Sequence, residues 1–579
     1  MLLEATEAAH SATQAVLGLP RGPYFKMAEE IGGHTLGYFL PELIVCFTLC
    51  LMLLVDVSDK LRSPRNLLSL AFVGMLAPLL LILGKWGTAL FIYPDWGNLA
   101  QAAHFFKDHG YVEVAGASML AFDGFANFFK IFALASGLIT LAMLHYDRSL
   151  PRKSFGEMLT LVLGSVLGMM LLASSTNLLM AYLSIELMSL ASFVLVAFKR
   201  SDRKGTEGAL KYMLFGAVSS GVMIYGISLL YGMAGTLDIA LMGQRLRDVN
   251  DPLAIGLALL MVTVGFGYKM SIAPAHFWAP DAYEGAPTPV TAFLSVASKA
   301  AGFAGFIRFM DAMAFQSTGN ALPIINWVSF VAVLGALTMT IGNLTALWQR
   351  NAKRMLAYSS IAHAGYLLIG VAAVAVGGEL GGDSGRAIAD MGASATAFYM
   401  IAYCIMNFGA FAVVMAVAHE TGSEEMSAFD GLAKRNMGLA VMMTILLLSL
   451  VGIPPTFGFL GKMNLFIAGL EAARAGYPIM AVLLVVAAVN TAISCYYYFR
   501  FLRAMFIAPG EPALVSRPLI VSNTGWLLVG GSALLTVGLF LWGSLFTAPT
   551  DEATMLRRTP APAAAEAQDA SKGHAGHGH

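Results

Sequence analysis

Charged side chains are scarce in this sequence. They make up 12% of its 579 residues, where a soluble domain carries roughly 25%. Apolar residues account for 58%, so water cannot be the main solvent around the folded chain. The formal net charge is zero and no basic face stands out, which excludes a nucleic-acid-binding protein.

Cysteine is also rare, with four residues that all lie inside apolar runs: Cys46, Cys50, Cys404 and Cys495. They form no Cys-x-x-Cys pair, so neither an iron–sulfur ligand set nor a disulfide framework is predicted, and we interpret them as small core residues. A dinucleotide fingerprint following a strand is missing too. Residues 1–30 lack an apolar stretch behind a basic start, so we expect no cleaved signal peptide.

What the sequence does have is long apolar runs. Runs of roughly 20 residues recur, each able to cross a hydrocarbon core of about 30 Å. An unpaired backbone amide in lipid costs several kcal/mol, so these runs must be helices. The sequence therefore predicts an all-α integral membrane protein with about fourteen transmembrane helices, near 36–56, 66–85, 118–145, 156–175, 177–198, 208–233, 253–285, 289–311, 323–348, 354–377, 392–418, 437–471, 477–507 and 522–546.

The basic residues gather in the loops after the odd-numbered spans. By the positive-inside rule these loops face the cytoplasm, which predicts a multi-pass protein of the bacterial inner (plasma) membrane with both termini on the periplasmic side. The residues concerned are Lys60, Arg62, Arg65, Arg148, Arg152, Lys153, Lys199, Arg200, Arg203, Lys204, Arg350, Lys353, Arg354, Lys434, Arg435, Arg500 and Arg503.

Two predicted spans carry prolines that a straight helix does not accommodate. Pro274 and the pair Pro454 and Pro455 each remove a backbone donor and clash with a carbonyl one turn earlier. Both runs also exceed one straight crossing, so we expect two broken helices. Interrupted helices in corresponding places of two halves indicate inverted repeats around a site at membrane mid-depth.

This pattern predicts six segments. They are an N-terminal segment (1–35), N-terminal transmembrane helices (36–150), a first five-helix repeat (151–315), a second five-helix repeat (316–510), a C-terminal transmembrane helix (511–548) and a disordered tail with several histidines (549–579).

Several charged residues fall inside the predicted spans, and we single out Glu186, Lys211, Lys269, Lys299 and Lys462. A charge at the bilayer centre costs roughly 2.5–3.5 kcal/mol on insertion scales, so one that is retained needs a partner, a water path or a task. Because desolvation disfavours the charged form of an amine, a buried lysine releases its proton more readily than a lysine in water. A nearby glutamate would determine whether that lysine holds or releases its proton.

Simpler interpretations stay open for some of these residues. Lys211 lies close to the basic loop 199–204, from which its side chain could reach the interface. Lys462 follows a predicted break and could line a hydrated cavity for structural reasons alone. His276 and His363 could relay protons or could simply join helices by hydrogen bonds.

The motifs around these charges resemble a known family, the antiporter-like membrane subunits of type I NADH dehydrogenase (respiratory complex I). The similarity covers most of residues 155–505 in order. It rests on ELMSL at 186–190, ALKY at 209–212, FGYKMSIAPAHFWAPDAYEGAPTPVTAFLSVASKAAG at 266–302, AYSSIAHAGY at 357–366 and LVGIPPTFGFLGK at 450–462. The details are most similar to the subunit N branch, because FLSVASK at 293–299 lacks the histidines of other branches and Lys462 stands where subunit M commonly has a glutamate.

The resemblance implies a proton-translocating subunit with a polar axis through the membrane. In this family Glu186 would pair with Lys269, Lys299 would connect two half-channels, Lys462 would serve the exit side, and His276 and His363 would lie on or near the axis. It implies that the subunit holds no cofactor, with FMN, iron–sulfur clusters and quinone in partner subunits. The implied partners are neighbouring antiporter-like and small membrane subunits and the lipid bilayer.

Two other functions compete with this one. A multisubunit Na⁺/H⁺ antiporter would use the same buried charges without redox input, but sodium prefers oxygen ligands and the buried set is dominated by lysine. The other is a structural membrane scaffold with vestigial charges. The free-energy cost of several mid-span charges argues against it, because it is too high for charges without a function.

Overall fold

The computed structural model describes residues 36–541 apart from 59–61, 93–118, 122, 148, 151–153, 200, 316–325, 511 and 513–517. The predicted N-terminal segment 1–35 and the predicted disordered tail 549–579 lie outside the described residues. So does most of the loop between the second and third predicted spans.

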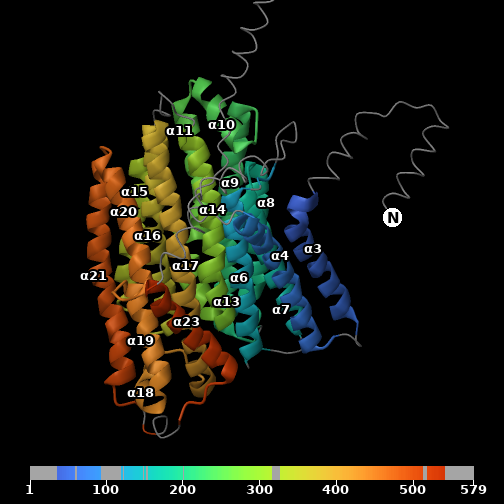
Figure 1. The fold of residues 1–579 in the computed structure, drawn as a ribbon, viewed down its shortest axis with the longest axis vertical. Coiled ribbons are helices and arrows are strands. Elements are labelled where there is room, and N and C mark those ends of the chain that lie inside the picture. The colour runs from blue at the N-terminus through green and yellow to red at the C-terminus, as the bar shows by residue number, and fades with distance from the viewer. Residues whose placement is uncertain are drawn as a thin grey trace, which may run out of the picture.

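The described chain is a bundle of long helices, as predicted (Figure 1). Within it, thirteen helices are long and apolar enough to cross a membrane, and one shorter apolar helix accompanies them. The unbroken ones are α3 (Leu36–Val57), α4 (Pro64–Ile92), α6 (Gly124–Tyr146), α7 (Phe155–Ser174), α8 (Leu178–Val196), α9 (Arg203–Ala234), α15 (Trp327–Ala346), α16 (Ala352–Leu380), α17 (Gly382–Thr421), α21 (Pro478–Phe506) and α23 (Asn523–Leu541). Short helices between them are α10 (Ile239–Arg245), η3 (Leu246–Asp248), η5 (Met426–Phe429) and α18 (Leu432–Arg435).

The two predicted helix breaks are confirmed. The seventh span consists of α11 (Pro252–Met270) and α12 (Trp278–Gly285), and Ser271 between them has a φ of 57°. The twelfth consists of α19 (Met437–Val451) and α20 (Phe457–Arg474), and Gly452 between them has a φ of 87°. Both residues therefore turn the chain out of the helix through the left-handed region.

The eighth span contains an irregularity that its sequence does not predict. Helix α13 (Thr288–Phe293) passes into a π-helical turn, η4 (Leu294–Ser298), before α14 (Lys299–Phe315) begins. Such turns are rare and occur frequently at functional sites. Here the turn ends immediately before a candidate site residue, Lys299.

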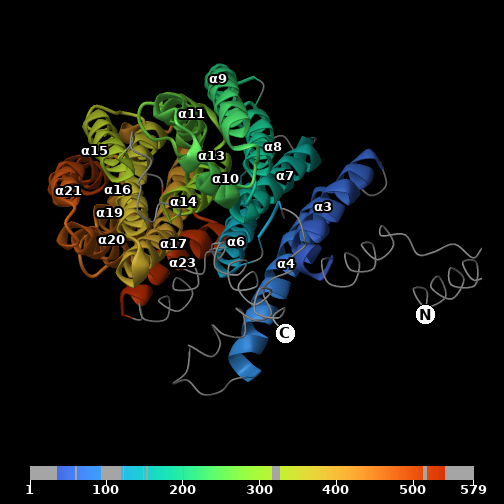
Figure 2. The same ribbon diagram turned by 90° about the horizontal axis from the view of Figure 1, so that it is seen from above.

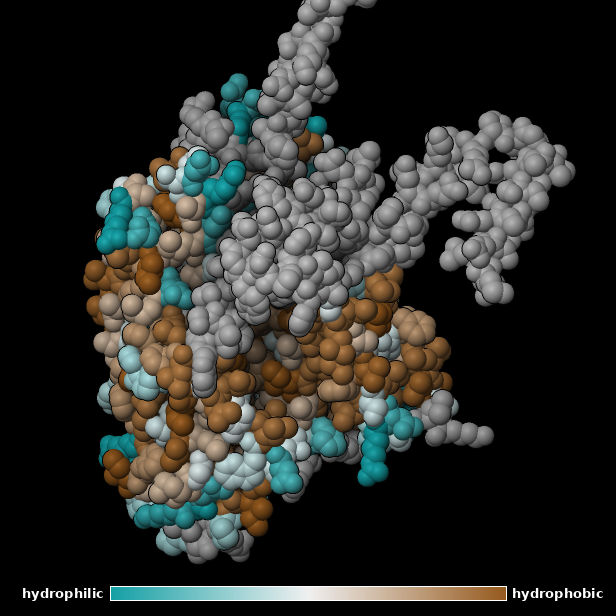
Figure 3. Space-filling view, viewed as in Figure 1, coloured by the Kyte–Doolittle hydropathy of each residue, from teal (hydrophilic) through white to brown (hydrophobic). Residues whose placement is uncertain are grey.

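Helices α16 and α17 form the centre of the bundle (Figure 2). The most apolar window of α16 is 100% buried and that of α17 is 89% buried, whereas only 28% is buried in α3 and α21. Brown, apolar side chains cover the middle of the face seen in Figure 3, and hydrophilic residues gather toward its ends. This distribution fits a bundle whose outer helices face lipid.

One prediction about the cysteines is wrong. Cys404 is buried, but Cys46 and Cys50 are exposed on α3. These two residues lie on the outer side of a helix at the edge of the bundle. Side chains there are apolar because they face lipid, so an apolar run does not show that a residue lies in the protein core.

Glycines bring α15 and α16 into close contact. A Cβ atom added at Gly365 would lie 2.5 Å from the backbone nitrogen of Met339, and one at Gly342 would lie 2.6 Å from that of Ala362. Small residues at such crossings let helix backbones approach closely, which is the main source of packing energy between helices in lipid. The position of α16, on which several site residues stand, therefore depends on these glycines.

We predict that Gly365→Ala lowers the free energy of unfolding by about 1–3 kcal/mol, because the methyl group forces the two backbones apart. Gly221→Ala is the matched control, since an added Cβ there meets nothing within 4 Å. Thermal unfolding of the purified protein in detergent measures both. Equal unfolding temperatures for the two variants would contradict the packing argument.

Candidate functional site

Lys269 is fully buried in the last turn of α11, directly before the break. Its Nζ donates hydrogen bonds to Ser189 Oγ on α8 (3.1 Å) and to the hydroxyl of Tyr212 on α9 (3.3 Å). The same amine lies 5.8 Å from the centroid of the Tyr212 ring. Hydroxyl groups and an aromatic ring thus replace water around this amine.

Glu186 lies near Lys269 but does not form an ion pair with it within 4 Å. Its carboxylate accepts a hydrogen bond from Ser220 of α9, and it stands one turn before Ser189, the serine that Lys269 contacts. Glu186 is half-buried, between the exposed side chains of Leu183 and Leu187. The carboxylate therefore lies toward the outer face of α8, and Ser189 of the same helix contacts the amine.

Lys299 is the second buried amine, 3% exposed at the start of α14. Its Nζ donates to Ser360 Oγ on α16 and lies 5.9 Å from the Tyr283 ring centroid. In the preceding π-helical turn, Ser295 Oγ accepts a hydrogen bond from Asn407 of α17 (2.6 Å). The turn thus positions the amine toward the central helix α16.

His363 stands one turn after Ser360 on α16 and is 3% exposed. One ring nitrogen bonds the hydroxyl of Tyr399 (2.5 Å) and the other approaches that of Tyr498 (3.4 Å). His363, Lys299 and Ser360 line one small cavity, with room of about 10 Å³ for the centre of a water molecule. That is on the order of the space one water needs. Most of the surface that faces the cavity is apolar, and the polar side chains of its lining are Lys299, Ser360, His363 and Tyr403.

Lys462 is the third buried amine, 6% exposed on α20. Its Nζ donates to the carbonyls of Leu450 (3.3 Å) and Val451 (2.7 Å), which end α19 at the break. It also lies 4.6 Å from the ring centroid of Tyr366, one turn beyond His363. The interrupted helix supplies the carbonyls, and a cation at a helix C-terminus is favourable.

The structure thus brings Lys299, His363 and Lys462 together around α16, and places Lys269 and Glu186 beside α8 and α9. His276 is separate: it is 4% exposed in the first break, stacks on Phe277 at 4.5 Å, and its Nδ1 has no hydrogen-bond partner in the described chain. The resemblance implied a position on or near the axis; His276 is buried, without a hydrogen bond to Lys299, His363 or Lys462 in the described chain.

Lys211 does not share the environment of the other lysines. Its side chain is 40% exposed and forms ion pairs with Glu207 (2.8 Å) and Asp281 (2.7 Å). The position near a basic loop explains this, because the long side chain reaches polar groups at the end of the bundle. The sequence left open whether Lys211 carries protons or extends to the membrane interface. This geometry fits a side chain at the interface.

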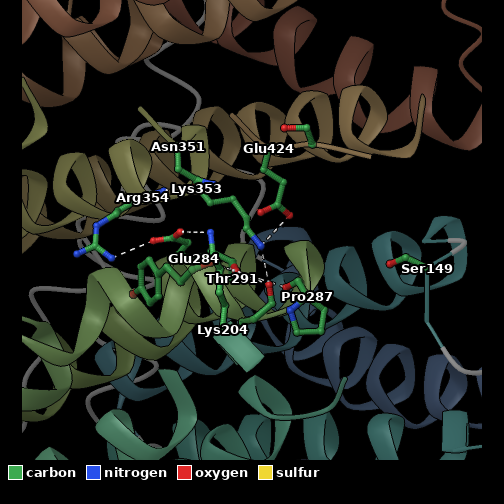
Figure 4. A network of polar contacts seen from close by, with 12 residues as sticks. Ser149, Lys204, Glu284, Pro287, Thr291, Asn351, Lys353, Arg354 and Glu424 are labelled. Atoms are coloured by element: carbon green, nitrogen blue, oxygen red, sulfur yellow. Dashed lines mark hydrogen bonds and ion pairs between the residues drawn. The ribbon is translucent and has the colours of Figure 1, made fainter. Parts of the chain in front are cut away.

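Lys211 belongs to a cluster of ion pairs that the sequence did not predict. Figure 4 shows other members of this cluster, Lys204, Glu284 and Arg354. Arg354 pairs with Asp281 and Glu284, while Lys204 also pairs with Glu284. Beside them, the buried Lys353 pairs with Glu424 (2.8 Å) and donates to the carbonyl of Ala286 (2.8 Å). The cluster joins α9 and α12 to α16. Asp281 and Glu284 lie on α12, the second part of the broken seventh span, and Glu424 lies between α17 and η5.

Two buried ion pairs were also missed, although the same criterion of charge within an apolar run would have found them. Lys130 of α6 pairs with Glu42 of α3 (2.7 Å). Arg308 of α14 forms a two-pronged pair with Asp123 (2.8 and 2.9 Å). In each the cation meets a carboxylate, whereas Lys269, Lys299 and Lys462 have none within 4 Å in the described chain. The ion pairs of Lys130 and Arg308 join helices. Lys269, Lys299 and Lys462 carry protons on amines that have no fixed counter-charge among the described residues.

The described residues offer no group of three or more His, Cys, Asp or Glu side chains that could hold a metal ion. The axis residues are chiefly amines, hydroxyls and imidazoles. Amines and imidazoles can each bind and release a proton, and hydroxyls both donate and accept hydrogen bonds. This set is therefore suited to carrying protons.

Comparisons with known proteins agree on one family. The family model for the transmembrane region of NADH:quinone oxidoreductase and Mrp antiporter proteins matches residues 175–489. NADH-quinone oxidoreductase subunit N from an Anaeromyxobacter species is 43% identical over 457 residues, which are 76% of this chain and 85% of the relative. Its counterpart from Chlorobium chlorochromatii is 38% identical over 547 residues, 92% of this chain and 97% of the relative.

Solved structures give the same result. A chain of respiratory complex I from Thermus thermophilus is 30% identical, with a TM-score of 0.67 over 88% of this chain and 98% of that one. A chain of the Mrp complex from a Dietzia species shares the fold at 21% identity, with a TM-score of 0.71 over 90% and 97%.

The fold and the site define a multi-pass membrane protein with buried protonatable side chains beside interrupted helices. More particularly, the chain belongs to the NADH-quinone oxidoreductase subunit N family. The resemblance inferred from the motifs is confirmed.

We predict that Lys462→Met destabilises the second break, because the carbonyls of Leu450 and Val451 lose their buried donor. Leaving a buried acceptor unsatisfied costs about 1–3 kcal/mol. Thermal unfolding in detergent should show the loss. The control is Lys434→Met, because the Lys434 side chain is exposed. An unchanged unfolding temperature for Lys462→Met would show that these hydrogen bonds do not hold the break.

Proposed function

We propose that this chain is the non-redox, proton-translocating subunit of an NADH:quinone oxidoreductase. The observation that carries the proposal is the set of three buried lysines whose amines contact hydroxyls, carbonyls and rings and lack a carboxylate within 4 Å in the described chain. The family membership and the likeness to a complex I chain support it.

Proton transfer would follow the side chains on α16. Lys299 contacts Ser360, His363 lies one turn further and shares its cavity, and Lys462 sits over the ring of Tyr366, a turn beyond. A water in the cavity would connect the Lys299 amine to the His363 ring by replacing the long contact of one ring nitrogen with Tyr498 (3.4 Å). Each group can hold a proton and pass it on, which a chain of apolar side chains cannot do.

Glu186 would couple this movement to the rest of the complex. A negative carboxylate near Lys269 favours the protonated amine, and the low-dielectric surroundings strengthen that attraction. Because Glu186 lies toward the outer face of α8, a charge change in an adjacent membrane subunit would reach it laterally. Withdrawing the negative charge would then release the Lys269 proton toward Lys299.

The remaining assignments belong to the same proposal. FMN, iron–sulfur clusters and quinone would be in partner subunits, and the contacts would be with neighbouring antiporter-like and small membrane subunits. Residues 151–315 and 316–510 would be the two inverted five-helix repeats, and both termini would lie on the periplasmic side. The corresponding breaks before α12 and α20 support the repeats.

We predict that Lys269→Ala and Glu186→Ala each sharply reduce NADH-driven proton pumping while assembly stays largely intact. The measurement is the number of protons moved per electron in vesicles reconstituted with the whole complex. Lys434→Ala, exposed on α18, is the control. A stoichiometry unchanged by both substitutions would overturn the proposed mechanism.

Purification of the tagged chain separates the proposal from a multisubunit Na⁺/H⁺ antiporter. Recovery with flavin- and iron–sulfur-bearing partners supports the oxidoreductase. Recovery with small membrane subunits alone would assign the chain to an antiporter.

A further inference from the structure

Helices α7, α8 and α9 enclose a groove apart from the proton path. It has a volume of about 900 Å³ and lies where α7 begins, α8 ends and α9 begins. Its wall is mostly apolar, with Leu161 of α7, Phe193 and Val194 of α8, and Leu210 and Met213 of α9. A groove of this chemistry beside a bilayer suits a hydrocarbon chain.

Among the described residues that line this groove, two are charged, and their charges have opposite sign. Lys199 follows the end of α8, and Glu157 lies in the first turn of α7. Both lie at the end of the bundle where α7 begins and α8 ends, and a lipid headgroup would lie at such an end. Charged side chains in pockets between transmembrane helices bind lipid headgroups there.

A chain of hydrogen bonds holds Lys199 at the groove. Its Nζ donates to Ser149 Oγ (2.7 Å), Ser149 Oγ donates to Asp147 (2.6 Å), and Asp147 contacts His419 of α17 (3.1 Å). Burial raises the pKa of the Asp147 carboxyl, but the hydrogen bonds with His419 and Ser149 outweigh it and hold that pKa below its ordinary value. An ionised Asp147 thus fixes Ser149, and the Lys199 ammonium keeps two further donors for a ligand.

We propose that this groove binds one phospholipid whose headgroup carries a primary amine, of the phosphatidylethanolamine class. The phosphate accepts hydrogen bonds from Lys199, the ammonium donates to Glu157, and an acyl chain lies along Leu161, Val194 and Met213. A purely anionic headgroup meets repulsion from Glu157. A phosphatidylcholine headgroup has the right charges but no N–H to donate.

The test uses the purified whole complex and a phosphatidylethanolamine with a photoreactive group in its acyl chain. Crosslinked peptides from α7, α8 and α9 are quantified by mass spectrometry. Unlabelled phosphatidylethanolamine should compete at about tenfold lower concentration than phosphatidylcholine or phosphatidylglycerol, as the loss of one charge-assisted hydrogen bond predicts.

Substitutions separate the two charges. Lys199→Met should lower crosslinking about tenfold with every headgroup, because each has a phosphate. Glu157→Gln should instead remove the preference for phosphatidylethanolamine over phosphatidylglycerol. Lys434→Met and Glu420→Gln change exposed charges elsewhere and should leave crosslinking unchanged. Met213→Trp fills the groove without altering charge and should abolish crosslinking there.

Three outcomes would overturn the proposal. They are equal competition by all three lipids, a preference for phosphatidylglycerol in the unaltered chain, and crosslinks from these helices to a protein segment in place of lipid. Native gels establish that each variant is assembled into the complex, so a loss of crosslinking is not a loss of folded protein.

Discussion

The cost of placing charge in a low-dielectric bundle governs the arrangement of this chain. Each buried cation must recover the interactions that water would provide. Lys130 and Arg308 recover them from the carboxylates of Glu42 and Asp123. Lys269, Lys299 and Lys462 recover them from serine hydroxyls, helix-end carbonyls and aromatic rings. A carboxylate partner fixes a proton on its lysine, whereas neutral partners leave the lysine able to release it.

A helix break provides the neutral partners of Lys462, and serine and tyrosine side chains of neighbouring helices provide those of Lys269 and Lys299. In an unbroken helix the carbonyls already accept the helix's own backbone hydrogen bonds. Where α19 ends at Val451, free carbonyls remain and Lys462 donates to them. Lys269 stands in the last turn of α11, and Lys299 follows a π-helical turn. All three amines therefore lie where regular helical hydrogen bonding is interrupted, and α16 beside two of them is held in place by close glycine packing.

Much of this could be predicted from the sequence because lipid imposes strong rules. Apolar runs and prolines located the spans and both breaks. Mid-span charge selected Glu186, Lys269, Lys299 and Lys462 as candidate site residues, and the structure buries the three lysines. Local sequence does not report which side of a helix faces its neighbours. That is why Cys46 was assigned to the core and the outward position of Glu186 was not expected. The ion pairs of Asp281 and Glu284 depend on three helices distant in sequence, and the π-helical turn has no compositional mark.

The central claim is that these buried side chains form one connected path for protons. The claim depends most on the step between Lys299 and His363. A structure of the assembled membrane arm at a resolution that reveals ordered water tests it most directly. The account predicts a water molecule in the cavity, hydrogen-bonded to the Lys299 amine and the His363 ring. A dry cavity closed by Leu367 and Met400, with no water between amine and imidazole, would contradict it.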